Sequence, residues 1–290
     1  ISVPEVTLGC DPEFFILWNG RRVSAATYLP FVGQVGCDGE LGELRPTYGR
    51  HESQVVANLS SLINRIPRSL RRSKWAVGYP EDGRAFQYEA HSYYGSVAAG
   101  FHVHLGIPPE ILNTRKDFHR VAMSFLVMCL DWYLSVPLVG LETNHKRRLG
   151  GSAYGKPGDY RPSNVTLEYR TPGAFYLRTP KLAAGLLGLA LLVTENAVAR
   201  IKAASGDFRN LHKLTFPELR ELLFVPEPAA VKEILTHPDT RVAMRNLDSI
   251  RKRLESLATF GKHAPAVDQF FRAVENQETP GPNLVSNWKE

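Results

Sequence analysis

The stretch GCDPEFFIL, residues 9–17, has the composition of a β-strand and carries Asp11 and Glu13 two positions apart. Three further stretches repeat this spacing of charged or imidazole side chains: GELRP (42–46), GFHVHLG (100–106) and TLEYRTP (166–172). In a strand, residues i and i+2 point to the same face. Four such strands laid side by side would therefore gather carboxylates, imidazoles and guanidiniums on a single face of a sheet.

Such a charged face cannot be a hydrophobic core, because burying unpaired charge costs too much free energy. It indicates instead a site for a divalent metal and a polyanion. Mg²⁺ prefers oxygen ligands and is usually held by one or two carboxylates together with substrate phosphates. The four stretches supply these carboxylates: Asp11, Glu13, Glu43 and Glu168. His102 adds a nitrogen ligand, which Mn²⁺ tolerates better than Mg²⁺ does.

The length and composition are those of a folded globular chain. With 290 residues it can bury a substantial core, as one large domain or as a domain with an appendage. A formal net charge of +6 suits an anionic ligand such as a nucleotide without requiring nucleic acid. The three cysteines have no CxxC spacing and are expected to be reduced thiols in a cytoplasmic setting. No secretory signal is visible, and the most apolar run, Leu182–Val193, is too short to cross a bilayer, so we expect a buried helix there.

The hydrophobic pattern mixes strands and long helices without strict βαβ alternation, which indicates an α+β fold with a largely antiparallel sheet. We expect strands at residues 6–18, 21–26, 33–45, 75–79, 99–107 and 165–171, with a hairpin turn at Asn19-Gly20. Helices are expected at residues 51–66, where Pro67 would end the helix, at 114–138 and at 181–201. After about residue 205 the chain is helical with proline breaks. We therefore predict a main domain at 1–205 and a helical C-terminal extension at 206–290 packed on it.

Two basic segments have different interpretations. A loop at residues 145–161 is rich in glycine and arginine, and its amides and guanidiniums suit a phosphate. It is not a P-loop, because GxxxxGK[ST] does not occur in the chain, and no GxGxxG follows the first strand. A second cluster, at residues 65–74, is interpreted as a solvated surface, with a nucleic-acid footprint as the minor alternative.

The HVH pair at residues 102–104 also allows a tightly bound Zn²⁺, as in zinc hydrolases. A cupin would need a glutamate a few residues downstream on the same strand, and the sequence offers none there. The later histidines do not form the pattern of an amidohydrolase. A zinc site is therefore the second choice.

Five motifs, taken in order, resemble those of a known family. GCDPEFF resembles the acidic strand of glutamine synthetases, GFHVHLG the GxHxH strand of glutamine synthetases and glutamate–cysteine ligases, and LEYRTP their ExR strand. With DGELGELRP (38–46) and RRLGGSAYGKPGDYR (147–161), they look closest to the phage-type carboxylate–amine ligases, or amidoligases, of that superfamily. The resemblance covers about residues 6–180. It implies a curved, largely antiparallel sheet of glutamine synthetase catalytic-domain type, backed by long helices.

The resemblance also implies a reaction and its cofactors, ATP and Mg²⁺ (or Mn²⁺). In such ligases ATP phosphorylates a carboxylate, and an amine attacks the acyl phosphate to give an amide. Two residues match ligands of one metal: Glu13 and Glu43. Three match ligands of the metal on the phosphate side: Asp11, His102 and Glu168.

Cationic and aromatic side chains complete the implied site. Arg148 and Arg161 would neutralise the transferring phosphate, and Arg170 would hold phosphate or a substrate carboxylate. His104 is expected beside the nucleotide or the substrate, and Tyr154 beside the nucleotide. The expected partners are small-molecule or peptide carboxylate and amine substrates, with no membrane and no requirement for nucleic acid.

The chain departs from the family pattern at Asp11, where the common residue is a longer Glu. Either Glu40 or Glu43 could face the metal, and we expect Glu43, since Glu40 keeps register with Asp38. Two alternatives stay open: a non-catalytic phage structural or interaction protein that retains the fold, and a zinc hydrolase. The expected location is the cytoplasm, that of the host if the chain is phage-encoded, with virion association as a further alternative.

Overall fold

The structure, a computed structural model, describes residues 3–112, 116–149, 154–206 and 208–289. Its strands are β1 (Thr7–Cys10), β2 (Glu13–Trp18), β3 (Arg21–Val23), β4 (Val35–Asp38), β5 (Leu41–Leu44), β6 (Gln87–Glu89), β7 (Tyr93–Tyr94), β8 (Val97–Ala98), β9 (Val103–Gly106), β10 (Tyr160–Pro162) and β11 (Leu167–Tyr169). Its α-helices are α1 (Glu52–Ser69), α2 (Pro109–Leu112), α3 (Lys116–Leu130), α4 (Val136–Val139), α5 (Pro180–Ser205), α6 (Phe216–Leu222), α7 (Pro228–Thr236), α8 (Thr240–Glu255), α9 (Phe260–Glu275) and α10 (Leu284–Asn287). Short helical turns are η1 (Ala25–Thr27), η2 (Gly83–Ala85), η3 (Asp131–Ser135, a π-helix), η4 (Ala174–Leu177) and η5 (Phe208–Lys213).

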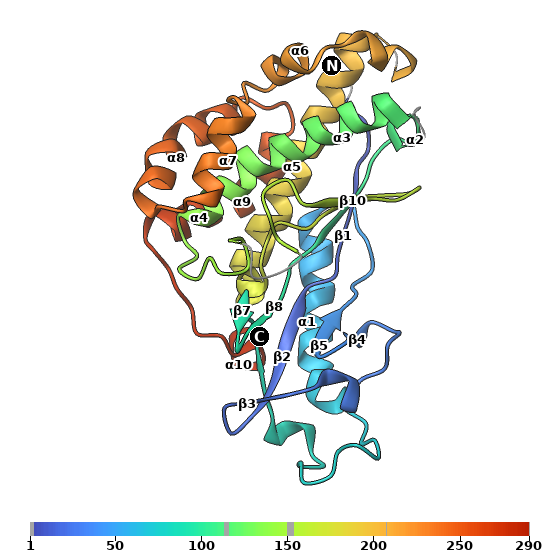
Figure 1. Cartoon of the computed structure of the whole chain (residues 1–290), viewed down its shortest axis with the longest axis vertical. Helices are drawn as coiled ribbons and strands as arrows, with labels where there is room; N and C mark the ends of the chain where they lie inside the picture. Colours follow the sequence, from blue (N-terminus) through green and yellow to red (C-terminus); the bar gives the residue numbers. More distant parts are fainter. Residues whose placement is uncertain (1–2, 113–115, 150–153, 207, 290) are drawn as a thin grey trace.

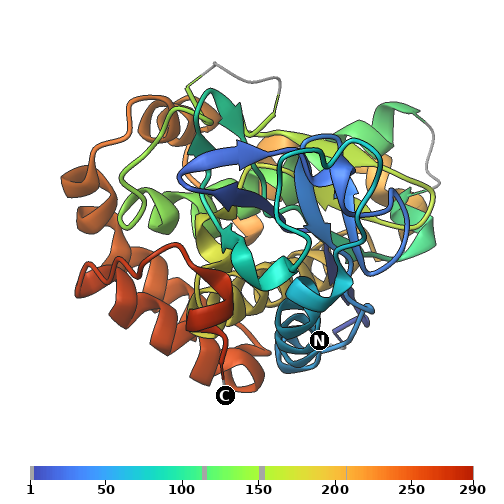
Figure 2. The same ribbon diagram turned by 90° about the horizontal axis from the view of Figure 1, so that it is seen from below.

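The expected α+β fold with antiparallel strands is confirmed. Each described pairing between strands is antiparallel. The strands lie on one side of the molecule, and α1, α5, α8 and α9 lie together on the other (Figures 1 and 2). The amphipathic stripe predicted for the first helix is buried in α1, where it faces the core: Val55, Leu59, Leu62, Ile63 and Ile66.

The prediction of a single sheet face is wrong, because the motifs are divided between two sheets. One sheet has the order β1-β9-β11-β10, and the other β3-β2-β5-β4 with β6 on β2. The expected strand at residues 6–18 is broken at Asp11 and Pro12, where the chain passes from the first sheet to the second. Pro12 has no N–H to donate to a ladder, which favours an interruption at this point.

Register brings the motif residues together within each sheet. In the first sheet, His104 on β9 lies opposite Glu168 on β11, and Glu168 lies opposite Arg161 on β10. In the second, Glu13 on β2 lies opposite Glu43 on β5. The corner at Asp11 also binds the first sheet, since Asp11 N donates to His102 O at 3.2 Å. The two sets of polar residues therefore meet where the sheets join.

Two tight hairpins shape the second sheet. The predicted turn at Asn19-Gly20 is confirmed, with φ of 50° and 73° at its two central residues, as a type I′ hairpin requires. The expected strand at residues 33–45 is a hairpin of β4 and β5, because Gly39 adopts a φ of 57° and reverses the chain. Glu43 lies opposite Gly36, two residues before Asp38, so Asp38 and Glu43 lie on the same face of the hairpin.

Two local predictions are wrong. Residues 75–79 are not a strand but consecutive turns, in which Ala76 N donates to Ser73 O and Tyr79 N to Ala76 O. Pro67 does not end the first helix, since α1 continues to Ser69. The expected helix at 114–138 is confirmed over its described part as α3, η3 and α4, and its first two residues lie outside the described ranges.

The two most apolar helical segments lie in the core. By length and composition, Arg120–Val139 and Pro180–Ser205 could each cross a membrane, but 89% and 94% of their apolar windows are buried inside the structure. α5 packs against α9 with no space between them, since a Cβ at Gly185 would lie 2.3 Å from Phe270 Cβ. This agrees with the buried helix expected from the sequence.

A buried ionic cluster joins α1, α5 and α9. His263 on α9 is fully buried, and its ring nitrogens lie 2.7 Å from Glu52 Oε2 and 3.0 Å from Glu195 Oε2. Lys262 Nζ lies 2.8 Å from Glu195 Oε1. The helices after residue 205 thus share a core with the earlier part of the chain. A domain boundary at residue 205 stays a prediction.

Candidate active site

The first acidic group lies where β2 and β5 pair. Glu13 and Glu43 are both buried, and together with Asp38 at the end of β4 they offer carboxylate oxygens within 4.8 Å of one another. Glu13 Oε2 accepts a hydrogen bond from Gly100 N at 2.6 Å. Glu43 Oε1 lies 2.6 Å from Arg45 Nε. The group therefore carries more negative charge than Arg45 neutralises.

The second group combines carboxylates with imidazoles. Asp11 Oδ1 lies 3.4 Å from His102 Nδ1, and Asp11 Oδ2 lies 2.9 Å from His104 Nε2. Glu168 Oε1 lies 3.6 Å from His102 Nδ1. Ligand atoms of Asp11, His102 and Glu168 all lie within 4.8 Å of one another. Within the described part of the chain, Asp11 Oδ1 is buried and has no hydrogen-bond partner, which leaves it available to a cation.

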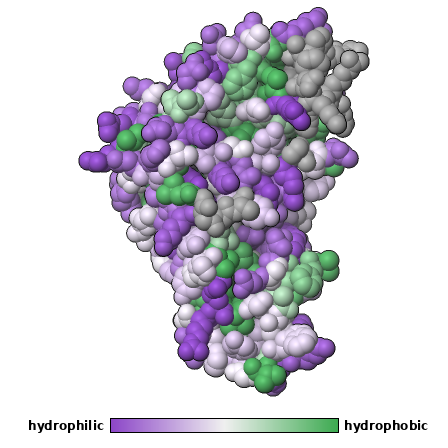
Figure 3. Space-filling view, in the orientation of Figure 1, coloured by the Kyte–Doolittle hydropathy of each residue, from purple (hydrophilic) through white to green (hydrophobic). Residues whose placement is uncertain are grey.

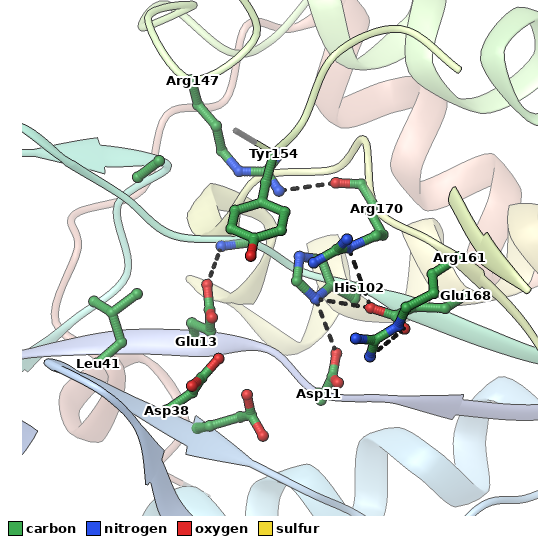
Figure 4. A pocket seen from close by; sticks show the side chains of 13 residues that line it. Asp11, Glu13, Asp38, Leu41, His102, Arg147, Tyr154, Arg161, Glu168 and Arg170 are labelled. Atoms are coloured by element: carbon green, nitrogen blue, oxygen red, sulfur yellow. Dashed lines mark hydrogen bonds and ion pairs between the residues drawn. The ribbon is translucent and has the colours of Figure 1, made fainter. Parts of the chain in front are cut away.

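Arginines border the second group. Arg161 Nε donates to Glu168 Oε2 at 2.7 Å, and Arg170 Nε lies 3.3 Å from Glu168 Oε1. The Tyr154 ring stacks on Arg170, with its centroid 4.1 Å from the guanidinium carbon. One buried carboxylate thus holds two guanidiniums beside the groups that could bind metal (Figure 4).

These groups line one cavity of about 490 Å³. Figure 4 shows Asp11, Glu13 and Asp38 at its lower side, Arg147 and Tyr154 at its upper side, and Glu168 beside Arg161 and Arg170 at the right. The described lining residues are Asp11, Glu13, Asp38, Leu41, Glu43, Ala98, Gly100, His102, Arg147, Tyr154, Arg161, Glu168 and Arg170. The cavity is therefore lined mainly by charged and polar side chains of both signs.

The carboxylates have divergent pKa values. Burial raises the pKa of Asp11, but its contacts with His102 and His104 outweigh burial and lower the pKa to about 2. Burial, and then the charge of Asp11, raise the pKa of Glu43 to about 7. Burial also raises the pKa of Glu13. In the group of Asp11, the imidazoles thus outweigh the cost of burial and keep the carboxylate charged. In the group of Glu13 and Glu43, burial and neighbouring negative charge prevail and favour the protonated form.

The donor sets fit divalent cations. Three carboxylates suit a hard ion such as Mg²⁺, and two carboxylates with one imidazole suit Mg²⁺ or Mn²⁺. The raised pKa of Glu43 and the unpartnered oxygen of Asp11 both favour a bound cation at these groups. The grouping is also the one that the family resemblance implied for the two metals. The metal-binding roles themselves stay predictions.

The structure distinguishes Arg148, which we expected at the site, from its neighbour Arg147. Arg147, which the sequence pattern does not single out, lines the cavity and donates to the carbonyls of Thr171 and Arg170 at 2.7 and 2.8 Å. Arg148 is not among the described lining residues and lies 3.6 Å from the buried carboxylate of Glu142. A loop gives no periodicity from which to tell which neighbour faces inward, so the sequence could not decide this.

The other expected residues can be placed as follows. Glu43 faces the cavity, while Glu40 lies 3.7 Å from Arg22 with its side chain 63% exposed. Asp38 is a further acidic residue of the site. It lies opposite Leu41 in the β4–β5 hairpin, and this hairpin brings it to the cavity. His104 contacts Asp11 but is not among the described lining residues. Residues 150–153 of the expected glycine-rich loop lie outside the described ranges.

Fold and cavity define an antiparallel α+β protein with a charged site between two sheets. A family model described as phage phiEco32-like COOH.NH2 ligase-type 2 matches residues 8–283, so the chain belongs to this family of carboxylate–amine ligases. No curated protein matches the chain. The solved structures similar to it include a bifunctional glutathione synthetase from Pasteurella multocida, at 12% identity and a TM-score of 0.45. That match covers 93% of this chain and 52% of the other, so the chain spans about half the length of that structure.

Proposed function

We propose that the protein is an ATP-dependent ligase that joins a carboxylate to an amine through an acyl phosphate. The observation that carries the proposal is the cavity in which two ligand groups for divalent cations adjoin the guanidiniums of three arginines. Family membership supports the class of reaction. We further propose that the two sheets form a catalytic fold of glutamine synthetase type, with Mg²⁺ or Mn²⁺ as the metal.

The reaction needs charge stabilisation more than a covalent partner. The γ-phosphoryl group passes to a carboxylate oxygen and ADP leaves; the amine then attacks the acyl carbon, inorganic phosphate departs with the bonding electrons, and the amine loses a proton. A phosphoryl group in transfer spreads negative charge over its oxygens, and prepositioned cations stabilise it. Bound Mg²⁺ would supply part of this charge. The arginines would supply the rest.

The arginines are held ready for that role. Glu168 fixes Arg161 and Arg170 by ion pairs, so neither has to be ordered when the phosphate arrives. Arg147 is 3% exposed and is anchored to the backbone carbonyls of Thr171 and Arg170. The charges of Arg147 and Arg170, which are largely removed from solvent, interact more strongly than charge in water, because less solvent screens them.

The test is release of ADP when the metal-replete protein is mixed with MgATP and a panel of amino acids and peptides. We expect ADP to appear only with a matching carboxylate and amine. Glu13→Gln should abolish it, whereas Glu40→Gln, which changes an exposed glutamate outside the cavity, should not. If no nucleotide binds at about 1 mM ATP, at the upper end of ordinary Michaelis constants, the ligase proposal is wrong.

A further inference from the structure

A second charged surface lies at the end of the molecule where α1 finishes. Between residues 65 and 85 there are six cationic side chains and two acidic ones, a net of +4 against +6 for the whole chain. The cationic residues are all exposed: Arg65, Arg68, Arg71, Arg72, Lys74 and Arg84. Figure 1 shows this segment at the lower end of the molecule, below the strands. We call residues 65–85 the basic surface.

Large apolar side chains are exposed within the basic surface. Trp75 is 72% exposed and Val77 is 79% exposed. Lys74 Nζ lies 4.8 Å from the centroid of the Trp75 ring. On this end of the molecule, Figure 3 shows hydrophobic and hydrophilic residues mixed. An indole left open to water beside cations is a platform on which a planar group can stack.

The segment is anchored to the fold. Arg71 N donates to Tyr28 O at 2.9 Å, and the Tyr28 hydroxyl donates to Pro80 O at 3.2 Å. Ala76 is fully buried directly after Trp75. At Gly83 the chain lies so close to Pro67 that a Cβ would be 2.0 Å from the Pro67 carbonyl oxygen. Because the segment is fixed at both ends and in the middle, Trp75 is presented on a supported loop.

We propose that the basic surface binds single-stranded nucleic acid. Guanidiniums match phosphate oxygens as forked donors, and five of the six cations are arginines. The exposed indole would stack on a base, which is available in a single strand and hidden in a duplex. An acidic peptide would pair with the cations but would offer no base to stack on the Trp75 ring. The cavity between the sheets takes no part, so this proposal stands or falls separately from the ligase proposal.

The experiment measures binding of a labelled oligothymidylate of about 16 nucleotides, the upper end of the site sizes of single-strand-binding folds. We expect tryptophan fluorescence to be quenched on binding, since Trp75 is exposed while Trp132 and Trp288 are buried. If four cations neutralise phosphates, log K should fall against log salt concentration with a slope of about −3, from −0.7 per phosphate.

Matched variants locate the site. Trp75→Ala should weaken binding by about tenfold, within the range for loss of one stacked base. Arg68→Glu/Lys74→Glu/Arg84→Glu should abolish it. The control Arg241→Glu/Arg245→Glu/Lys252→Glu makes the same change of charge on exposed cations of α8 and should leave binding unchanged. Glu13→Gln should also bind normally. Thermal unfolding of each variant confirms that it is folded.

Three outcomes would overturn the proposal. One is absence of binding at low salt. Another is equal loss in both triple variants, which would mean attraction by overall charge. The third is binding of duplex DNA or polyglutamate as tight as that of the single strand, which would mean that the ring is not used.

Discussion

At the residue scale, the site depends on which of two glutamates in one hairpin faces inward. Glu40 is the last residue of the β4–β5 turn and reaches Arg22 at the surface. Glu43 lies three residues further, opposite Glu13 in the sheet, and cannot avoid its neighbour's charge. Burial, then the charge of Asp11 and to a smaller extent that of Glu13, raise the pKa of Glu43 to about 7.

We predict that Glu43→Gln weakens Mn²⁺ binding by about a hundredfold, the upper range seen when groups supporting a metal are lost. The neutral amide keeps the shape but loses the charge that a cation requires. Isothermal titration with Mn²⁺ measures the change. Glu40→Gln serves as the matched control and should bind as the wild type does. Equal effects of the two substitutions would show that Glu43 is not a ligand.

The sequence identified four residues of the site, since Asp11, Glu13, His102 and Glu168 line one cavity. They come from two sheets, however, and not from the single face that the i, i+2 pattern predicted. Asp38 and Arg147 could not be found in this way, because one depends on the geometry of a hairpin and the other on the path of a loop. Side-chain direction in such segments is set by contacts distant in sequence, such as that of Arg147 with Thr171.

At the scale of elements, the β4–β5 hairpin fits against β2 only because residue 42 is glycine. A Cβ at Gly42 would lie 2.2 Å from Phe14 Cζ, well inside contact distance. Phe14 is fully buried, so its ring has no room to move away. The hairpin, and Glu43 with it, is thus placed by this close approach.

We predict that Gly42→Ala destabilises the protein by about 1–3 kcal/mol, the usual cost of overpacking a core. It should also weaken Mn²⁺ binding, since Glu43 is the next residue. Chemical denaturation and metal titration measure the two effects. Gly281→Ala, where a Cβ would meet nothing within 4 Å, should change neither. A neutral Gly42→Ala variant would contradict the tight packing described here.

The cluster of Glu52, His263 and Glu195 joins three helices by charge. Burial lowers the pKa of His263, but its contacts with Glu195 and Glu52 outweigh burial and raise it. Burial raises the pKa of Glu195, but His263 and Lys262 outweigh it and lower that pKa. His51, Glu52 and His263 also lie close enough for a metal ion. However, Lys262 and the N-terminus of α1 already place positive charge there.

We predict that this cluster stabilises the fold most between about pH 4.5 and 6.5, the ordinary pKa values of Glu and His. Because the pKa of His263 is raised in the folded state, its contribution to stability is complete below pH 6.5. That contribution is lost as the pH rises through the pKa of His263 in the folded protein. A lowered pKa means that the contribution of Glu195 is lost as the pH falls below 4.5. A pKa that differs by one between the folded and unfolded states contributes on the order of 1 kcal/mol to stability.

The measurement compares unfolding free energies of the wild type and the neutral variant Glu52→Gln/His263→Leu/Glu195→Gln across pH. The difference should be largest in the stated window and shrink on its alkaline side. A difference that grows steadily above pH 7 would contradict a protonated His263.

Elements were predictable where their signals are local. The Asn19-Gly20 hairpin, α1 and α5 follow from turn chemistry and hydrophobic period. The prediction of a strand at residues 75–79 was wrong. Trp75 and Val77 alternate with other residues as in a strand, but both are exposed in a loop. The prediction of a single sheet face failed, because the break at Pro12 divides the strands between two sheets. The effect of one proline on strand pairing appears only in three dimensions.

At the scale of the whole molecule, the proposed site lies where the two sheets join. β1 ends in the first sheet and β2 begins at Glu13 in the second, with Asp11 at the corner between them, so the two ligand groups become neighbours. If ATP and metal bind across this joint, they should hold the sheets together. We predict that saturating MgATP, at about 100 times its dissociation constant, stabilises the fold by about 2.7 kcal/mol. Thermal unfolding with and without EDTA measures this, and Glu13→Gln should abolish the effect.

The most direct measurement is a crystal structure with Mn²⁺ and a non-hydrolysable ATP analogue, in which anomalous scattering locates the metal. We predict manganese at both groups, one held by Glu13, Asp38 and Glu43 and the other by Asp11, His102 and Glu168, with phosphates reaching toward Arg161 and Arg170. Manganese bound elsewhere, with both groups empty while the nucleotide is in place, would contradict a metal-assisted ligase site between the sheets.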